Sequence, residues 1–324
     1  MKRVVTLGGG TGSFVVLNSL KNHPVELCAI VSMADDGGST GILRDELGVL
    51  PPGDVRQCLI ALSDSSRLMR SLMNYRFENG GLQGHSFGNL LLSALEKTTG
   101  SFEKAVEEAG KILNIKGKVI PITTHQTRLK MLLNSGRLLE GEGEIYISTE
   151  VHKGFKSIYL EPFPKADPHA IDEIMNADLI ILGPGGLYTS LIPNLLVEGI
   201  PKALRESKAK KLFIVNLMNK NSQNPEFKAS HYLQEIVHYL GKDCFDYILI
   251  NSGRPSKELI HLYSEEGDLV ENDLSKDSRI VYVDLIENQT SEYSSSDVLS
   301  KKRALIRHDP KKLSQAILKI LEEV

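Results

Sequence analysis

The sequence predicts an α/β fold: a Rossmann-like, doubly wound and mostly parallel sheet with helical segments and a small β-rich insertion. Three apolar runs support this, Val4–Leu7, Val25–Met33 and Ala177–Leu182. Their apolar residues do not alternate with polar ones, which is typical of strands buried on both faces of a parallel sheet. Two of the runs lead directly into glycine-rich turns, and segments with helical spacing lie between the strands. Alternating strands and helices favour this fold class.

The first half of the chain begins as strand, turn, helix and strand. Val4–Leu7 is the first strand, Phe14–Lys21 has helical spacing, and Val25–Met33 is the second strand. Residues 54–110 are predicted to be helical, because apolar residues recur at helical spacing in Val55–Leu62, Leu68–Tyr75, Leu90–Leu95 and Phe102–Ala109. Residues 117–160 are predicted to be β-rich, with strands at Val119–Ile120, Leu129–Leu133, Glu144–Ser148 and Ser157–Leu160. We therefore expect one α/β domain over residues 1–324, with the insertion at 111–165.

The second half repeats the strand and helix alternation. Ala177–Leu182 is followed by a glycine turn and a helical stretch to Ser207. Further strands are expected at Lys211–Leu217, Tyr247–Asn251 and Ile280–Val283, and further helices at Ser230–Leu240 and Lys311–Leu321. Asp309-Pro310 is a helix start signal for the last of these. A polar, Ser-rich loop is expected at 289–297, and whether it is phosphorylated is left open.

Composition excludes several classes of protein. The chain has 324 residues, is 41% hydrophobic and 24% charged, and carries a net charge of -3. With a pI near 6.3 and no run of five like charges, it lacks the basic face that nucleic-acid binding requires. Three dispersed cysteines argue against a disulfide framework or a zinc knuckle, so a cytoplasmic protein is expected. No stretch reaches the ~18 apolar residues of a membrane span.

A glycine-rich turn follows the first strand and opens a helix. Glycines bring successive backbone N–H groups and the positive end of the helix dipole against a phosphate group. Gly8 and Gly10 fit a dinucleotide-binding pattern, but its third glycine is replaced by Ser13 and the acid expected about 20 residues later is missing. We therefore expect a phosphate site without NAD, and a tight turn without a ligand is the alternative. The expected contacts are Gly9, Gly10, Thr11, Gly12 and Ser13.

A second glycine turn, Gly183-Pro184-Gly185-Gly186, follows the buried run Ala177–Leu182. Two such turns at strand ends of one sheet can face each other across the point where the strand order reverses. Tyr188 could stack on a base or sugar and Thr189 could donate to a phosphate, or both could simply pack the loop. Asn216 and Asn219 bracket the end of the next strand, at the same edge. The expected phosphate or nucleotide contacts here are Gly183, Gly185, Gly186, Tyr188 and Thr189.

Acidic and polar side chains stand just past the second strand. Asp35 and Asp36 could bind a ribose hydroxyl or a magnesium ion, although Asp-Gly is also an ordinary turn former. Because adjacent side chains diverge, only one of the two is expected to face a ligand. Asp54 follows two prolines and is interpreted first as a helix N-cap. Ser39, Arg44 and Asp54 complete the candidates for ribose, metal or sugar binding in this region.

Gly84-His85-Ser86-Phe87-Gly88 matches the nucleophile elbow of hydrolases. An elbow needs a buried strand before its serine, whereas a polar glycine loop precedes this one, so the match is interpreted as accidental. Ser86 is predicted to cap the helix that follows. His85 and Asn89 remain candidates for ligand binding from this loop.

Taken together in this order, the motifs resemble the gluconeogenesis factor (YvcK-like) family, which is related to the CofD-type 2-phospho-L-lactate transferases. The resemblance covers residues 1–220. It depends on Gly8–Gly12, Ala34–Ser39, Pro52–Arg56, Arg76–Gly80, Gly84–Ser86, Gly88–Leu91 and Gly183–Gly185. It implies a cytoplasmic, Rossmann-like protein that binds UDP-activated N-acetylglucosamine and supports gluconeogenic growth and cell shape. The related transferases move phospholactate from a guanosine diphosphate carrier to a deazaflavin.

One segment departs from the family pattern. Relatives usually carry Gly-Glu-Thr and then Ala-Ser-Asp-His after the stretch that matches Asn216–Asn219, where this chain has Lys220–Glu226 and Ala229–Tyr232. The resemblance therefore does not extend to ligand selectivity at this segment.

Two functions are expected from the residues and the resemblance. The first is a nucleotide-sugar-binding regulator without turnover, because no convincing nucleophile or general base accompanies the two loops. The alternative is a CofD-like transferase that moves a phosphate-linked group from a nucleoside diphosphate carrier. No cofactor is required by the first function, although Mg²⁺ could accompany a diphosphate. The expected partner is the nucleotide ligand; no catalytic residue is assigned, and a homodimer is left open.

Overall fold

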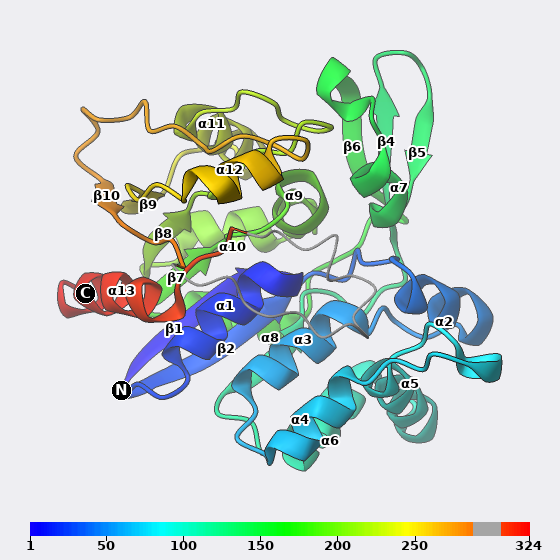
Figure 1. Ribbon diagram of the computed structural model, residues 1–324. Helices are drawn as coiled ribbons and strands as arrows, with labels where there is room; N and C mark the ends of the chain where they lie inside the picture. The colour runs from blue at the N-terminus through cyan, green and yellow to red at the C-terminus, as the bar shows by residue number, and fades with distance from the viewer. Residues whose placement is uncertain (288–305) are drawn as a thin grey trace.

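The computed structural model describes residues 1–287 and 306–324. Seven parallel strands form its main sheet, in the order β10-β9-β8-β7-β1-β2-β3 (Figure 1). The Ser-rich loop expected at 289–297 lies outside the described residues. The strands are β1 Lys2–Gly8, β2 Val25–Val31, β3 Lys118–Pro121, β7 Leu179–Leu182, β8 Lys210–Ile214, β9 Tyr247–Asn251 and β10 Ile280–Val283. The predicted α/β class is confirmed.

The strand order reverses between β1 and β7. From β1 the chain builds outward through β2 to β3, and from β7 it builds in the opposite direction through β8 and β9 to β10. Because crossovers between parallel strands are right-handed, the two directions place their helices on opposite faces of the sheet. The boundary between the two halves is the topological switch point at which open α/β sheets bind ligands.

The helices cover both faces of the sheet (Figure 1). The side chains of Val16, Leu17 and Leu20 on α1 are fully buried, as are those of Cys58 and Leu59 on α3, and the two helices pack against each other. The helices are α1 Gly10–Leu20, α2 Ser39–Leu47, α3 Gly53–Leu62, α4 Arg67–Asn74, η1 Gly80–Leu82, α5 Phe87–Thr99, α6 Phe102–Ile112, α7 Glu142–Ile147, η2 Val151–Lys153, α8 Pro168–Met175, η3 Leu187–Leu191, α9 Ile192–Leu195, α10 Ile200–Glu206, α11 Ala229–Leu240, α12 Lys257–Tyr263 and α13 Pro310–Glu322.

Two of the three predicted helix starts are confirmed. The Ser86 side chain accepts the Asn89 N–H at the start of α5, and Asp309 caps α13 with Pro310 in its first turn. The prediction that Asp54 is an N-cap is wrong. Helix α3 begins one residue earlier, at Gly53, with Pro52 in the cap position. Asp54 therefore lies inside the first turn, where its carboxylate is directed at another part of the chain.

The insertion is a three-stranded antiparallel sheet in the order β5-β4-β6, which stands beside α2 away from the main sheet (Figure 1). Its strands are β4 Arg128–Leu133, β5 Leu138–Glu140 and β6 Phe155–Glu161. Every second side chain of β4 is buried, which is the pattern of a sheet with one face toward a core.

Two of the strands predicted between residues 117 and 160 are corrected. Val119–Ile120 belongs to β3, which pairs with β2 in the main sheet, so the antiparallel sheet starts later than expected. Glu144–Ser148 was expected as a strand, but it overlaps helix α7. The positive φ of 104° at Gly141 turns the chain, and the Ile145 N–H then bonds the Gly141 carbonyl as in a helix. Short apolar segments do not distinguish helix from strand by periodicity alone.

Candidate functional site

The two glycine loops meet at the switch point. Gly8–Ser13 follows β1 and Gly183–Gly186 follows β7, and these two strands are neighbours. A β-carbon on Gly12 would lie well inside 3.0 Å of the Pro184 carbonyl oxygen, so the backbones approach as closely as only glycine permits. The structure therefore brings the two loops together, as the sequence predicts.

Asn216, just past the end of β8, holds the second loop in position. Its side-chain oxygen accepts the Gly185 N–H at 3.1 Å, and its amide nitrogen donates to the Gly185 carbonyl at 2.8 Å. Both polar groups of Gly185 are therefore engaged within the protein. Asn216 positions the loop, and the N–H of Gly185 is not free to bind a phosphate.

Three other candidates from this region pack inside the protein. Tyr188 is 4% exposed and its ring packs edge-to-face on Phe155, with 5.1 Å between centroids. Asn219 is buried; it donates to the Phe227 carbonyl and accepts from the Tyr232 hydroxyl. Thr189 is buried as well. Tyr188 thus takes the packing role that the sequence left as an alternative, whereas the buried Thr189 hydroxyl donates to Glu142.

Two carboxylates lie against the first glycine loop and the start of α3. Asp54 accepts the backbone N–H of Gly10, and Asp35 accepts the N–H of Gly37 at 3.0 Å. Burial raises the pKa of Asp35 and raises that of Asp54 well above its ordinary value, and the repulsion between the two carboxylates adds to the shift of Asp54. Each side chain therefore favours a proton, a cation or a hydroxyl donor as its neighbour.

Asp36 points elsewhere. Its carboxylate accepts the Gly143 N–H at 2.7 Å and lies close to Gly141, so it ties the loop before α7 to the end of β2. The adjacent side chains of Asp35 and Asp36 diverge, as expected. Asp35 is the one directed at the start of α3, where it lies against Gly53.

Glu142 and Lys220 are site residues that the sequence reasoning missed. Burial raises the pKa of Glu142 to about 8, helped by repulsion from Asp35 and then Asp36 and opposed by a hydrogen bond from Thr189. Burial lowers the pKa of Lys220 to about 8, against the attraction of Glu142. The Lys220 ammonium lies 3.1 Å from the centroid of the Tyr146 ring.

Both missed residues have a signal in the sequence. Glu142 stands between two glycines, Gly141 and Gly143, which is the local composition that marks the other loops of the site. Lys220 is the first residue of the segment that departs from the family pattern. Lys220 places a cation beside Glu142.

A buried polar network lies behind Asp35. The Ser39 hydroxyl is 3.0 Å from Nδ1 of His85, Asn89 donates to Ser39 at 3.3 Å, and Arg56 donates to Asn89 at 2.8 Å. Asn89 also donates to Thr40, whose hydroxyl bonds Asp35. The network joins α2, α3 and α5, so Ser39, His85 and Asn89 are brought together as a support for the carboxylates.

Arg44 lies outside this network. Its side chain is buried and one guanidinium nitrogen donates to the Thr127 carbonyl at 3.3 Å, just before β4. Attraction to Asp36 partly opposes the lowering of the Arg44 pKa by burial. Arg44 therefore packs α2 against the base of the antiparallel sheet.

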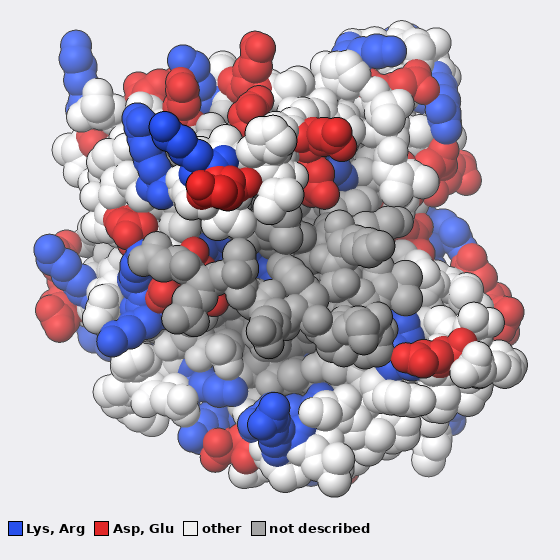
Figure 2. All heavy atoms as spheres, in the orientation of Figure 1, with Lys and Arg blue, Asp and Glu red and all other residues white. Residues whose placement is uncertain are grey.

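A basic groove of about 890 Å³ begins at Thr11 and runs along α1, α3 and α4. Lys and Arg side chains gather over α3 and α4 below the centre of the face in Figure 2. Two acids, Asp64 and Glu78, are among the described residues that line the groove, and the cations are Lys21, Arg56, Arg67, Arg70, Arg76 and Arg307. The groove is thus strongly positive although the whole chain carries a net charge of -3, so the expectation that the chain lacks a basic face is wrong.

Comparisons with known proteins agree with this arrangement. The family model described as 2-phospho-L-lactate transferase CofD matches residues 4–291. A putative gluconeogenesis factor from Aquifex aeolicus is 43% identical over 98% of this chain and 96% of its own length. The gluconeogenesis factor of Bacillus subtilis is 38% identical over 99% of this chain and 98% of its own. The chain belongs to the CofD family, among the gluconeogenesis factors.

A solved structure supports the same assignment for this gluconeogenesis factor. The crystal structure of a Bacillus halodurans protein superimposes with a TM-score of 0.88 at 38% sequence identity, covering 98% of this chain and 99% of that one. In the part of the chain that the structure describes, no helix combines the length and the apolar character needed to cross a membrane.

Proposed function

We propose that this gluconeogenesis factor binds a nucleotide sugar of the UDP-N-acetylglucosamine type and acts as a regulator, without turnover, that supports gluconeogenic growth and cell shape. The observation that carries the proposal is the meeting of two glycine loops at the switch point, between β1 and β7. Because the Gly183 and Gly185 N–H groups bond within the protein, the second loop closes against the first, and the start of α1 supplies the donors for phosphate oxygens.

The diphosphate would bind on the Thr11 side of the loop. The first N–H groups of α1 have no partner within the helix, and the Gly10 N–H donates to the Asp54 carboxylate. The N–H groups of Thr11 and Gly12 can then donate to phosphate oxygens, with the helix dipole adding attraction. The basic groove that begins at Thr11 supplies the long-range field for an anion.

The carboxylates suit the neutral parts of the same ligand. Asp35 and Asp54 would repel a phosphate, but they accept hydrogen bonds from ribose or sugar hydroxyls. Lys220, in the segment between β8 and α11, and Glu142, the first residue of α7, would contribute to the choice of sugar. A nucleotide sugar offers both an anionic and a hydroxyl-rich part, which matches a site with a basic and an acidic side.

The direct test is calorimetric titration of the protein with UDP-N-acetylglucosamine, with GDP and NADH as comparison ligands. We expect saturable binding of the nucleotide sugar at one site per chain and much weaker binding of NADH. No heat at millimolar UDP-N-acetylglucosamine would contradict the proposal.

The acidic cluster favours a second candidate function, a CofD-like transferase acting on a nucleoside diphosphate carrier. Asp35, Asp54 and Glu142 offer the oxygen ligands that Mg²⁺ prefers, and Mg²⁺ could hold the diphosphate and neutralise charge on the leaving group. The test is Mg²⁺-dependent release of nucleotide from such a carrier across a panel of acceptors. Release that is abolished by Asp54→Asn would support the transferase, and absence of turnover with every acceptor would support the regulator.

A further inference from the structure

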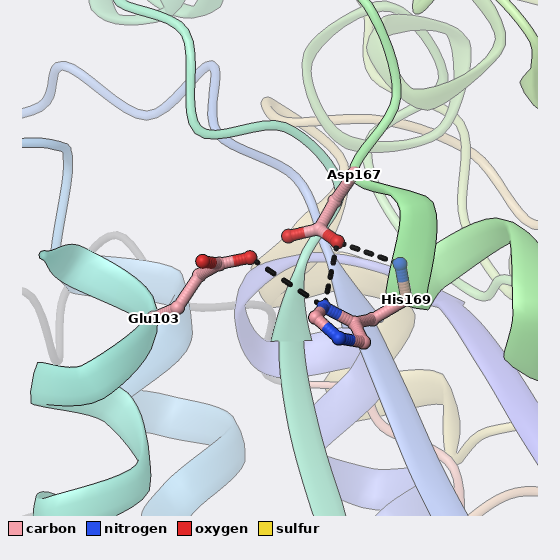
Figure 3. A group of neighbouring side chains, drawn as sticks. All are labelled: Glu103, Asp167 and His169. Atoms are coloured by element: carbon pink, nitrogen blue, oxygen red, sulfur yellow. Dashed lines mark hydrogen bonds and ion pairs between the residues drawn. The ribbon is translucent and has the colours of Figure 1, made fainter.

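Three metal-ligating side chains converge away from the glycine loops, between α6 and α8 (Figure 3). Glu103 is in the first turn of α6, Asp167 is the N-cap of α8 and His169 is in the first turn of α8. One ligand atom from each lies within 4.8 Å of the other two. Neither the motifs nor the proposed function uses these residues.

Asp167 is the buried member of the group. Its side chain is 1% exposed, and its Oδ1 accepts the His169 N–H at 2.8 Å and lies 3.3 Å from Nδ1 of the same histidine. Oδ1 alone therefore satisfies the helix cap. Oδ2 is buried and has no hydrogen-bond partner among the described residues. In Figure 3 the oxygen of Asp167 without a dashed line is on the side of Glu103.

Two carboxyl groups that face each other are unfavourable unless a proton or a cation lies between them, and Glu103 and Asp167 are close enough to share a hydrogen bond. Both groups only accept hydrogen bonds when ionised, and an unsatisfied buried acceptor is costly to the fold. The Nδ1 atom of His169 is 3.7 Å from Oε1 of Glu103, so the imidazole completes a set of one nitrogen and two carboxylate groups. A positive ion that accepts both ligand types would take the place of the shared proton.

We propose that Glu103, Asp167 and His169 bind one divalent transition-metal ion of the zinc class, which links α6 to α8. Imidazole nitrogen suits zinc and its neighbours in the first transition row, whereas magnesium and calcium prefer all-oxygen sets. The Glu103 and His169 side chains are 40% and 73% exposed, so the ion reaches the site from solvent and keeps water on its open positions.

The surroundings are electrostatically suited to a cation. The three residues lie on the wall of a cavity of about 750 Å³, which is also lined by the acids Glu107, Asp172 and Glu173. With Glu103 and Asp167 the wall has five acids against three lysines, and Lys118 is already paired with Glu173 at 2.6 Å. The local field therefore attracts a metal ion to the cluster.

In the test, metal is removed from the whole chain with a chelator, the chelator is removed, and the protein is titrated with zinc chloride alone. We expect one zinc ion per chain with micromolar or tighter affinity, and a melting temperature that rises by roughly 3 to 6 °C at a hundredfold excess over Kd. His169→Ala and Glu103→Gln should each weaken binding at least tenfold. His261→Ala, which removes an exposed histidine on α12, is the matched control and should bind as the wild type does.

A second readout is spectroscopic. Cobalt in place of zinc should give ligand-field absorption that His169→Ala removes and His261→Ala preserves. Zinc binding of equal strength in the wild type and His169→Ala, or no binding at 100-fold more zinc than protein, would overturn the proposal. Neither experiment involves a nucleotide, so its failure is distinguishable from failure of the proposed function.

Discussion

Glu142 is a carboxyl group that the fold keeps protonated near neutral pH. Its folded-state pKa of about 8 lies above the ordinary value of 4.5 because the group is buried and faces Asp35 and Asp36. Between these two values the folded chain holds a proton that the unfolded chain has released. Stability is therefore full below pH 4.5 and is lost as the pH rises through about 8.

Glu142→Gln should remove this dependence. Between pH 4.5 and about 8, the unfolding free energy of the wild type should fall by on the order of 2 kcal/mol relative to that of the variant. This is less than the full pKa shift implies, because the side chain keeps some solvent access. Urea denaturation at a series of pH values measures the difference. Glu107→Gln, at an exposed position of α6, is the control and should follow the wild-type curve. Parallel curves for wild type and Glu142→Gln would show that the fold does not hold this proton.

At the scale of elements, the site depends on how closely two loops approach. The turn after β1 and the turn after β7 touch at Gly12 and Pro184, and Asn216 secures the second turn. Because the contact is between backbones, no rotamer change can relieve the steric clash of a methyl group added there.

Gly12→Ala should therefore separate the loops. We expect at least a tenfold loss of affinity for UDP-N-acetylglucosamine and a destabilisation of about 1 to 3 kcal/mol, the usual cost of overpacking. Gly81→Ala is the matched control, because a β-carbon there meets nothing within 4 Å. Titration calorimetry and thermal unfolding of both variants test this. A Gly12→Ala protein with wild-type affinity would mean that the loops need not touch to bind the ligand.

At the scale of the whole molecule, cations are concentrated in one groove. The basic groove reaches the first glycine loop at Thr11, and its Arg56 attracts the carboxyl groups of Asp35 and Asp54. The net charge of -3 averages over the whole chain and conceals this groove. An anionic ligand should therefore be attracted from a distance and oriented as it arrives.

Affinity for UDP-N-acetylglucosamine should then fall with salt. The Debye length shortens from about 10 Å at 0.1 M to 3 Å at 1 M, so we expect several-fold weaker binding at the higher concentration. The double variant Arg67→Gln, Arg70→Gln should bind more weakly and respond less to salt. Lys202→Gln, on α10 outside the groove, should behave as the wild type. Binding that is independent of salt would remove the groove from the recognition of the ligand.

The sequence by itself determined the framework. Unalternating apolar runs identified the buried strands, and the turns at Gly8–Ser13 and Gly183–Gly186 were predicted to face each other because both follow parallel strands of one sheet. The Ser86 and Asp309 caps were predictable too, since a cap is decided by a few neighbouring residues. These features depend on the chemistry of a few neighbouring residues or on the pattern of apolar residues along a strand. Both can be recognised along the chain.

Only the tertiary structure decided which polar side chains meet. Asp54 appeared to be a cap, Glu142 lay in a segment predicted to be β-rich, and Lys220 was a residue of a divergent segment, yet their charges affect one another in the fold. The partners of Glu103 are 64 and 66 residues further along the chain, at 167 and 169. Spacing along the chain does not encode such distances, because side-chain direction and burial follow from the packing of elements around a shared core.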